Sequence, residues 1–471
     1  MKKNDVIELN ITDISNMGEG IGHFEGMTFF VSGAIPGDVI SAGVTKLKKT
    51  YGYARIIEIK EPSPDRVESI CPVALRCGGC QIMQMEYGAQ LRWKERSVRE
   101  KLHRIGGFSD ELIDRVMQPM IGMEVPFYFR NKAQYPVGSD AASNTVMGFY
   151  ASHSHRIVTA NRCFLGSGIN EKIRDVITAC DEVVPYDEMT KKGLLRHVMI
   201  RTSNSYPDVM VALVVNSARM TRDIREMVDA LLGPFSSVET EDSRVSSVVV
   251  NYNDKPGNVI MGERCETVYG DSFIRDRIGE LEYHISALSF YQVNPIQTKK
   301  LYDKVLEYAG LSGSEVVWDL YCGIGTISLY LAPHAGAVYG VEVIPDAIRD
   351  ARENAALNRI ENAHFIVGKA EEVLPDFYSG NTDISDPSAK HPDVIVVDPP
   401  RKGCDRDCLS TMLQMQPERI VYVSCDPATL ARDLKYLCVD GVYELRAVAP
   451  LDQFGHSVHV ETVVLLTKQN T

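Results

Sequence analysis

The chain has 471 residues, of which 44% are hydrophobic and 24% charged, which is typical of a folded protein of about three domains and excludes a disordered or collagen-like chain. It carries 50 Lys and Arg against 63 Asp and Glu, a net charge of −13, so any nucleic acid must meet a local basic surface. No apolar run approaches the roughly 20 residues that span a bilayer, and the start of the chain lacks the apolar core of a signal peptide. We therefore expect a cytoplasmic protein with no membrane partner, acting as a monomer, whose 11 cysteines stay reduced.

Residues 1–60 predict a small closed β-barrel. The expected strands, which alternate or are rich in β-branched residues, are Val6–Ile14, Met27–Val31, Val39–Lys46 and Tyr53–Ile59. Frequent glycines lie between them, as the corners of a small barrel require. Such barrels often bind oligonucleotides, and a packing or dimerisation module accounts for the pattern equally well.

A linker at Glu61–Asp65 is followed by an expected helix over Tyr87–Arg104 that is rich in cations. The segment contains only two acidic residues, Glu95 and Glu100, and six basic ones: Arg92, Lys94, Arg96, Arg99, Lys101 and Arg104. On a net-acidic chain this helix is a candidate contact for an RNA backbone, although an ordinary solvated helix face shows the same pattern.

A group of cysteines predicts a metal centre. Cys71, Cys77 and Cys80 are close together in the chain, two glycines separate the last pair, and Cys163 is a natural fourth ligand. Four thiolates suit zinc or an iron–sulfur cluster. Structural zinc sites more often show two Cys-x-x-Cys pairs, so the three-plus-one spacing favours a [4Fe–4S] cluster.

From about residue 295 the pattern becomes a regular alternation of strands and helices, which predicts a doubly wound α/β domain with a mostly parallel sheet. The expected parallel strands are Val316–Leu320, Ala337–Val343, His364–Val367, Val394–Val397 and Arg419–Ser424. Two late strands, Tyr443–Val448 and Val458–Leu466, are expected to pair antiparallel, and Asn381–Lys390 is expected to be an exposed loop.

A glycine turn at Gly323 and Gly325 follows the first of these strands and opens a helix, as in sites where a ligand approaches the backbone. Glu342 ends the next strand, where an acid can bind ribose hydroxyls, and Asp398 ends the fourth. A dinucleotide-binding turn would carry a third glycine where Ser328 stands. We therefore favour S-adenosylmethionine over NAD as the cofactor.

Two residues predict the chemistry. Cys425 ends the fifth strand and precedes a helix, whose N-terminus is expected to favour the thiolate. A thiolate that adds to carbon 6 of uracil makes carbon 5 nucleophilic, and a base must then remove the carbon-5 proton. Glu461, in an apolar strand, is the candidate base, with a solvent-facing strand-end Glu as the alternative. Asp398-Pro-Pro-Arg401 lacks the aromatic fourth residue of amino-group methyltransferases, which favours methylation on carbon.

Taken together, these motifs resemble the RNA 5-methyluridine methyltransferase family, specifically its iron–sulfur 23S ribosomal RNA branch, over nearly the whole chain. The resemblance implies a TRAM barrel at 1–60, a central α+β domain at 66–290 with Cys71, Cys77, Cys80 and Cys163 as [4Fe–4S] ligands, and a class I methyltransferase domain at 291–471.

The resemblance also implies the roles of single residues. It assigns cofactor contacts to Gln292, Tyr321, Gly323, Gly325, Glu342 and Asp398. It assigns Cys425 as the nucleophile, Glu461 as the base, and Phe290 and Arg130 as contacts to the extruded uridine and to the RNA backbone. Phe290 as an ordinary core residue is the alternative.

Relatives that act on transfer RNA generally lack the barrel and the cluster cysteines, so 23S ribosomal RNA is the expected substrate and partner. The alternatives are the same chemistry on tRNA, a non-catalytic RNA-binding or assembly factor, and radical chemistry at the cluster. Radical S-adenosylmethionine enzymes typically use Cys-x3-Cys-x2-Cys, which this chain does not have.

Overall fold

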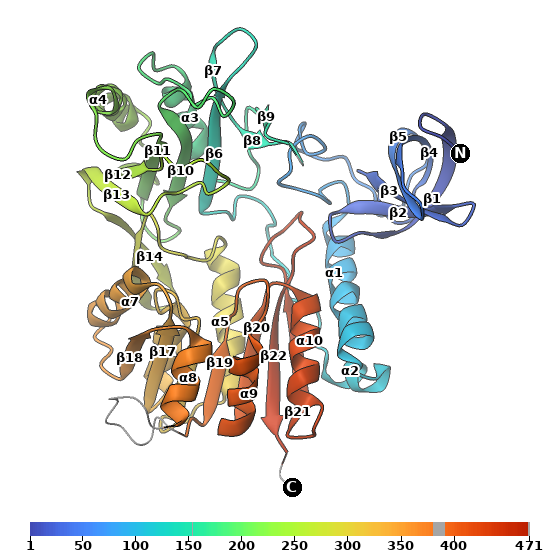
Figure 1. The fold of residues 1–471 in the computed structure, drawn as a ribbon, viewed down its shortest axis with the longest axis vertical. Coiled ribbons are helices and arrows are strands. Elements are labelled where there is room, and N and C mark those ends of the chain that lie inside the picture. Colours follow the sequence, from blue (N-terminus) through green and yellow to red (C-terminus); the bar gives the residue numbers. More distant parts are fainter. Residues whose placement is uncertain (153, 380–390, 470–471) are drawn as a thin grey trace.

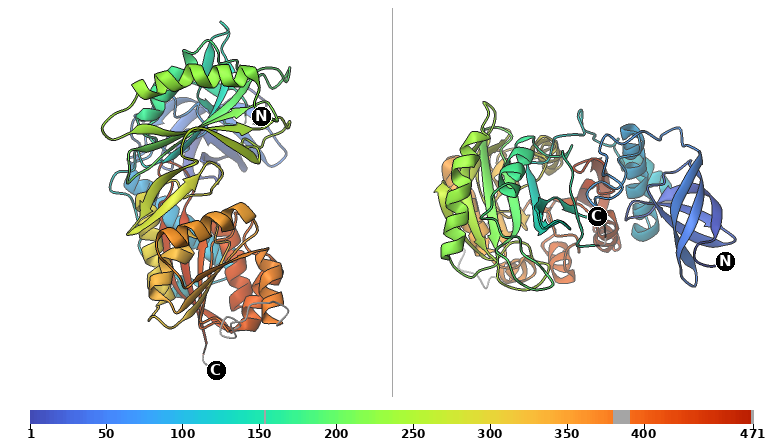
Figure 2. Two further views of the ribbon diagram at one scale, coloured as in Figure 1. Left: turned by 90° about the vertical axis from the view of Figure 1, so that its left-hand side faces the viewer. Right: turned by 90° about the horizontal axis from the view of Figure 1, so that it is seen from above.

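The computed structural model describes residues 1–152, 154–379 and 391–469 and shows three parts (Figure 1). A barrel is formed by the N-terminal residues, a central sheet by the middle of the chain, and a larger helix-covered sheet by the C-terminal part. Figure 2 shows the central sheet stacked on the C-terminal part, with the barrel set to one side. The expected loop at Asn381–Lys390 lies outside the described residues.

The N-terminal part is a closed five-stranded barrel, as expected, in the order β1-β2-β3-β5-β4. Its strands are β1 (Val6–Ile14), β2 (Glu19–Phe24), β3 (Met27–Ser32), β4 (Val39–Leu47) and β5 (Tyr51–Glu61). The sequence did not predict β2, because Gly20 and Gly22 interrupt its apolar pattern. The structure explains Gly20, since a Cβ there would lie 2.7 Å from the carbonyl oxygen of Ala34. Glycine is therefore required at this position, because the loop that follows β3 packs directly against β2.

The basic helix is α1 (Tyr87–Lys101), which continues as a π-helical turn, η1 (Leu102–Gly106), before α2 (Asp110–Val116). Five of its six cations have a carboxylate partner, and Lys101 donates to Ser97 instead. The pairs are Arg92–Asp65, Lys94–Asp452, Arg96–Asp13, Arg99 with Asp110 and Asp114, and Arg104–Glu100. Because most of its cations are already paired, α1 is better interpreted as a helix that holds neighbouring segments together than as a surface that binds RNA.

One of these pairs is completely buried and joins α1 to the C-terminal part. The Lys94 ammonium donates to Asp452 Oδ1 at 2.6 Å and to the carbonyl of Phe454 at 3.1 Å, and neither charged side chain is exposed. The Tyr87 hydroxyl donates to the other Asp452 oxygen at 2.8 Å. Beside them, Gln90 of α1 bonds both the backbone N–H and the ring of His456. Helix α1 therefore holds the segment that leads into the last strand.

The central sheet has six strands in the order β13-β12-β11-β10-β6-β7. They are β6 (Lys132–Ser139), β7 (Thr145–Met147), β10 (Leu195–Thr202), β11 (Asp208–Val215), β12 (Arg244–Tyr252) and β13 (Arg264–Gly270). Helices α3 (Ile169–Thr178) and α4 (Arg222–Ser237) cover one face, and a short hairpin, β8 (Phe149–Tyr150) with β9 (Ile157–Val158), lies nearby. Every residue of β10 and β11 is buried, because the hairpin β14 (Phe273–Ile278) and β15 (Leu281–Ser286) covers the opposite face.

The C-terminal part confirms the expected doubly wound α/β fold, with the strand order β18-β17-β16-β19-β20-β22-β21. The strands are β16 (Val316–Leu320), β17 (Ala337–Glu342), β18 (Ala363–Val367), β19 (Val394–Val397), β20 (Arg419–Ser424), β21 (Tyr443–Leu451) and β22 (Glu461–Lys468). The first five are parallel, and β22 pairs antiparallel with β21, as expected. It also pairs antiparallel with β20, which the sequence did not predict.

Helices cover both faces of this sheet, because alternate residues of its strands enter two separate apolar cores. On one face lie α5 (Pro295–Ala309), α6 (Thr326–Leu331) with the short turn η2 (Ala332–His334), and α7 (Pro345–Leu357). On the other lie α8 (Ala370–Tyr378), α9 (Arg406–Met415) and α10 (Pro427–Cys438). Within the described ranges, no helix is both long and apolar enough to cross a membrane.

The buried pair predicts a large stability effect for a single substitution. Lys94→Met leaves Asp452 charged and unpaired in the interior, and we expect the free energy of unfolding to fall by about 3–5 kcal/mol. Urea denaturation measures this loss. The double variant Lys94→Met/Asp452→Leu is expected to recover much of it, because no lone charge remains. As a control, Arg222→Met removes an exposed ion pair to Glu226 and is expected to cost less than about 1 kcal/mol. Equal losses in Lys94→Met and Arg222→Met would contradict the role given to the buried pair.

Candidate functional site

Five strands of the C-terminal sheet bring acidic and nucleophilic groups to one edge. In a doubly wound sheet this edge, where the parallel strands end, is where ligands bind. Asp319, at the end of β16, is fully buried, and its Oδ2 accepts from the Ser328 hydroxyl at 2.5 Å. Its Oδ1 has no hydrogen-bond partner among the described residues. Burial raises the pKa of Asp319 to about 7. An unsatisfied buried oxygen at this edge fits a site that is completed by a ligand.

The glycine turn after β16 is built for close approach of a ligand. Gly323 and Gly325 both have positive φ, at 56° and 79°, and Tyr321 adopts φ 69°, which is strained for a non-glycine residue. A Cβ on Gly323 would meet nothing within 4 Å, so open space lies in front of the turn. Glu342 fixes the turn, because its carboxylate accepts from the N–H groups of Gly323 (3.2 Å) and Ile344 (3.0 Å). The backbone at Gly323 therefore faces a space that a cofactor can fill.

Cys425 and Glu461 lie at the same end of two paired strands. Ser424, the last residue of β20, is the register partner of Thr462 in β22, so the residues after and before them, Cys425 and Glu461, are brought together. Glu461 is only 4% exposed, which excludes the alternative of a solvent-facing strand-end residue. Cys425 is half-buried and remains accessible.

The charges of these groups influence one another. Burial raises the pKa of Glu461 to about 8, and the nearby carboxylate of Asp398 adds to the rise. Burial likewise raises the pKa of Asp398 to about 6. Burial raises the pKa of Cys425 to about 11, with further contributions from Glu461 and Asp398. The site therefore places a thiol of raised pKa beside a carboxyl group whose pKa lies near neutral pH.

The expectation that the helix N-terminus favours a Cys425 thiolate is wrong for this state. Asp426, the N-cap of α10, already accepts hydrogen bonds from the N–H groups of Ala428 (2.8 Å) and Thr429 (3.1 Å). The positive end of the helix is therefore neutralised by the residue next to Cys425. Burial and the two carboxylates then determine the pKa of the thiol.

Arg401 is a site residue that the sequence analysis did not include. Its charge lowers the pKa of both Glu461 and Cys425, so it stabilises the two anions that the proposed reaction would use. Arg401 is exposed at the rim, and its carbonyl accepts from the Thr429 hydroxyl of α10 at 3.1 Å. The sequence could have indicated this role, because the motif Asp398-Pro-Pro-Arg401 places a cation three residues after the acid that follows strand β19.

The other residues predicted to contact the cofactor or the uracil ring differ from one another in burial. Gln292 is buried, and its side-chain oxygen accepts from Gln453 Nε2 at 3.4 Å. The Tyr321 hydroxyl contacts the Cys408 thiol on the helix side of the sheet, and burial raises its pKa. Phe290 is 65% exposed, which excludes the core alternative and leaves its ring free to contact a ligand.

The four cysteines of the predicted metal centre line one small cavity of about 90 Å³ in the central part of the chain. Burial and the neighbouring thiols raise the pKa of Cys80 to about 12. Arg130 lines the same cavity and lowers the pKa of Cys77, Cys80 and Cys163, so the structure places it beside the cysteines. In the part of the chain that the structure describes, no group of three or more His, Cys, Asp or Glu side chains is arranged to hold a single metal ion.

Comparison with known proteins gives two family matches within the chain. The profile of the family described as tRNA (Uracil-5-)-methyltransferase matches residues 266–469. The profile of the TRAM domain matches residues 2–57, which is nearly the whole barrel.

Whole-chain relatives and a solved structure agree with these matches. An uncharacterized RNA methyltransferase of Halalkalibacterium halodurans is 44% identical over 473 residues, covering 100% of this chain and 98% of the relative. One of Clostridium acetobutylicum is 43% identical over 471 residues, covering 99% and 98%. The crystal structure of Pyrococcus abyssi tRNA (uracil-54, C5)-methyltransferase in complex with S-adenosyl-L-homocysteine is 25% identical, with a TM-score of 0.74 over 98% of this chain and 100% of that chain.

The electrostatic coupling at Cys425 can be tested by alkylation with iodoacetamide, followed at the Cys425 peptide by mass spectrometry. Only the thiolate reacts, so the rate is expected to rise with pH toward a midpoint near 11. At pH values above 8, where Glu461 is ionised, Glu461→Gln removes a negative neighbour and lowers the pKa of the thiol. We expect alkylation there to be roughly three- to tenfold faster.

Arg401→Gln is expected to have the opposite effect and slow the alkylation of Cys425. Glu444→Gln serves as the matched control, because Glu444 raises the pKa of Cys438 and is not among the groups that raise the pKa of Cys425. The Glu444→Gln substitution should therefore accelerate the alkylation of Cys438 and leave that of Cys425 unchanged. An unchanged Cys425 rate in Glu461→Gln would show that the carboxylate and the sulfur do not interact.

Proposed function

The chain belongs to the TRAM-domain family of S-adenosylmethionine-dependent RNA uracil-C5 methyltransferases, and from this premise we propose that it methylates carbon 5 of a uridine in 23S ribosomal RNA. The observation that carries the mechanism is the placement of Cys425 and Glu461 at the same end of paired strands β20 and β22. A thiol and a buried carboxyl group are the two side chains that this reaction requires.

In this mechanism, Cys425 first loses its thiol proton to water, and its thiolate then adds to carbon 6 of the uracil ring. The electron pair of the 5,6 double bond makes carbon 5 nucleophilic. The cofactor supplies a methyl group on a sulfonium, which carbon 5 takes up. Glu461 then removes the proton from carbon 5, the double bond re-forms, and the thiolate of Cys425 leaves. A pKa near 8 suits Glu461 for this step, because the carboxylate is basic enough to accept a proton near neutral pH.

The residues at the edge of the sheet fit a bound S-adenosylmethionine. Gly323 offers close approach to the backbone, Glu342 is at the position where ribose hydroxyls bind, and the free oxygen of Asp319 provides an additional acceptor. Asp398, Gln292, Tyr321 and Gly325 complete the set that we propose for the cofactor. The acidic surroundings favour a cation, and the sulfonium is one.

The barrel offers a surface that suits RNA. The rings of Phe30, Tyr51 and Tyr53 form a half-buried cluster on β3 and β5, with centroids 5.8–5.9 Å apart. The end of β4 and the turn that follows it add exposed cations at Lys46, Lys48 and Lys49. Aromatic rings beside lysines are the combination with which barrels of this type bind single strands. We propose that this surface holds the RNA while exposed Phe290 stacks on the extruded uridine.

The choice of substrate between rRNA and tRNA rests on the cysteines. The barrel does not distinguish the two, because the Pyrococcus abyssi tRNA enzyme matches 98% of this chain. The expectation that tRNA-acting relatives lack the barrel is therefore wrong for that protein. The set Cys71, Cys77, Cys80 and Cys163 still resembles the 23S branch, and this supports rRNA. The same chemistry on tRNA is the second candidate.

We propose a [4Fe–4S] cluster at these cysteines. All four line one cavity, and Arg130 supplies a positive charge that favours thiolates over thiols. In a cubane each cysteine binds a different iron, so the four sulfurs need not converge on one point as they do around zinc. We assign the cluster a structural role.

Methyl transfer from radiolabelled S-adenosylmethionine to 23S rRNA transcripts and to tRNA tests the function. Cys425→Ala is expected to lose roughly a thousandfold or more of the activity, since the nucleophile is gone. Glu461→Gln should instead accumulate a methylated RNA–protein adduct that survives denaturing electrophoresis, because the carbon-5 proton stays in place. Cys438→Ala, which removes a half-buried thiol at the far end of α10, is the control and should remain active.

Several outcomes would contradict the proposal. Activity in Cys425→Ala would exclude the thiol mechanism, and a wild-type protein that methylates no RNA would favour an RNA-binding or assembly factor. Methylation of tRNA alone would select the second candidate. Release of 5′-deoxyadenosine on reduction would indicate radical chemistry, whereas we expect S-adenosylhomocysteine without any reductant.

The cluster is tested by metal analysis of protein purified without oxygen. We expect about four irons per chain and a broad absorbance near about 400 nm. Cys80→Ser should abolish both, whereas Cys180→Ser, which changes a half-buried cysteine outside the cavity, should change neither. Stoichiometric zinc without iron would overturn the assignment.

A further inference from the structure

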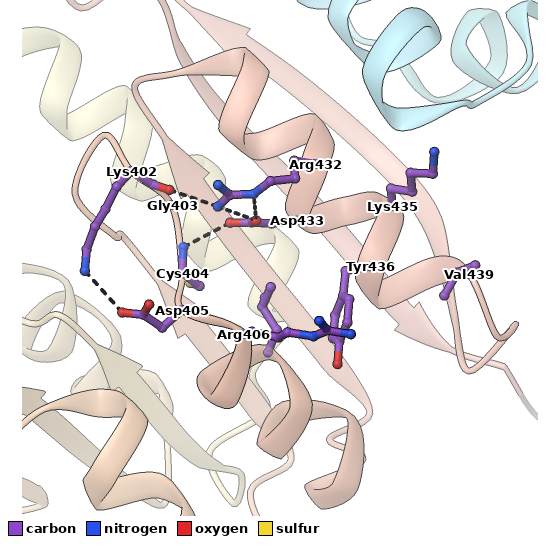
Figure 3. Close-up of a pocket in the computed structure, with 11 residues that line it drawn as sticks. Lys402, Gly403, Cys404, Asp405, Arg406, Arg432, Asp433, Lys435, Tyr436 and Val439 are labelled. Atoms are coloured by element: carbon purple, nitrogen blue, oxygen red, sulfur yellow. Dashed lines mark hydrogen bonds and ion pairs between the residues drawn. The ribbon is translucent and has the colours of Figure 1, made fainter.

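A basic hollow lies on the helix side of the C-terminal sheet, between α9, α10 and the loop that follows β19 (Figure 3). It has a volume of about 700 Å³ and lies on the helix side, whereas Cys425 and Glu461 lie at the edge of the sheet. Its lining contains four cations, Lys402, Arg406, Arg432 and Lys435, and two carboxylates, Asp405 and Asp433. On a chain of net charge −13, a concave surface with a surplus of cations is a candidate anion site.

The surplus charge resides on two side chains. Lys402 pairs with Asp405 at 3.1 Å, and Arg432 pairs with Asp433 at 2.7 Å. Within residues 1–152, 154–379 and 391–469, Arg406 and Lys435 have no carboxylate partner. Both are exposed, and the Arg406 guanidinium lies 5.7 Å from the centre of the Tyr436 ring, which orients it beside the hollow.

The wall of the hollow is held rigidly. Asp433 is fully buried and accepts from the N–H of Cys404 (2.9 Å), the Tyr422 hydroxyl (2.7 Å) and Arg432 Nε (2.7 Å). Arg432 also donates to the carbonyl of Lys402 at 2.9 Å. Gly403 has φ 79°, and a Cβ there would lie 2.4 Å from Asp433, so the loop packs directly against α10. The hollow is therefore formed before any ligand binds.

The hollow begins where the candidate active site ends. Its loop follows directly on Arg401, whose charge reaches Cys425 and Glu461. The other wall, α10, starts just after Cys425, and Lys435 lies on its third turn. At 1.5 Å per residue, Lys435 is roughly 15 Å along the helix from Cys425, a span of a few nucleotides.

We propose that this hollow binds the phosphodiester backbone of the substrate RNA next to the uridine held at Cys425, an inference that rests on the proposed function. Arg406 and Lys435 contact phosphates, because they are the cations that no carboxylate of the described residues neutralises. Lys402 and Arg432 keep the loop in place and add to the positive potential. A backbone held here continues from the active-site rim along α10.

The test is the salt dependence of RNA binding, measured by the fluorescence anisotropy of a labelled single-stranded RNA that contains uridines. In Arg406→Gln/Lys435→Gln, the slope of log affinity against log salt is expected to fall by about 1.4, which is about 0.7 for each lost phosphate contact. This corresponds to roughly 25-fold weaker binding at 0.1 M salt. The matched control, Arg222→Gln/Lys299→Gln, removes the same charge from exposed helix residues that have acidic partners, and it should change neither quantity.

The outcomes separate this inference from the proposed function. An unchanged slope and affinity in Arg406→Gln/Lys435→Gln overturns the inference, whatever the methyl-transfer assay shows. Equal losses in the pocket variant and the control variant overturn it as well, since net charge then explains the effect. A selective loss of binding supports it, even if the wild-type protein methylates nothing and the proposed function fails. A wild-type protein that binds no RNA contradicts both.

Discussion

The attachment of helix α1 to the C-terminal part depends on the buried ion pair between Lys94 and Asp452. Lys94 is on the helix that follows the barrel, and Asp452 begins the segment that leads into β22 and Glu461. The same helix binds the barrel through Asp13 and the linker through Asp65, so one element connects the barrel to the segment before the proposed base. Two charges that are both removed from water require each other, and this requirement fixes the register of α1 against that segment.

The chemistry at the sheet edge follows from a second constraint, the burial of like charges. Asp319, Asp398 and Glu461 are acids gathered at the edge around Cys425, and burial raises the pKa of each of them. Such a cluster is unfavourable for the empty protein and favourable for a cationic ligand. Arg401, which is exposed, reduces the repulsion between these carboxylates because its positive charge lowers the pKa of Glu461. The site thus combines a thiol of raised pKa with a buried carboxyl group whose pKa lies near neutral pH, and the charge of a ligand is expected to shift both pKa values.

Features that depend on neighbouring residues in the chain could be predicted from the sequence, whereas contacts between residues far apart in the chain could not. Strands β16, β19 and β20 were predicted with their observed bounds because continuous apolar runs end at turn residues. Strand β21 extends beyond the prediction through Pro450, which an edge strand tolerates. Cys425 and Glu461 were each identified from the sequence, but their meeting follows from the pairing of β20 with β22, which the sequence did not predict. The pairing of Lys94 with Asp452 joins positions far apart in the chain and has no local signal. Burial and the carboxylates of Glu461 and Asp398 raise the pKa of the Cys425 thiol, which the helix N-terminus was expected to lower.

The distribution of charge bears on how an acidic protein can act on RNA. The buried carboxylates around Cys425 would repel a phosphate, whereas a uracil ring carries no charge and can enter. Cations lie instead at Arg401, along the hollow beside α10, and on the barrel at Lys46, Lys48 and Lys49. A strand whose backbone stays on these cations can reach the sulfur only by turning one base out of its stack. In the proposed complex, the electrostatics of the site therefore favour entry of an uncharged base over entry of a phosphate, and this preference requires no contact that reads the sequence of the RNA.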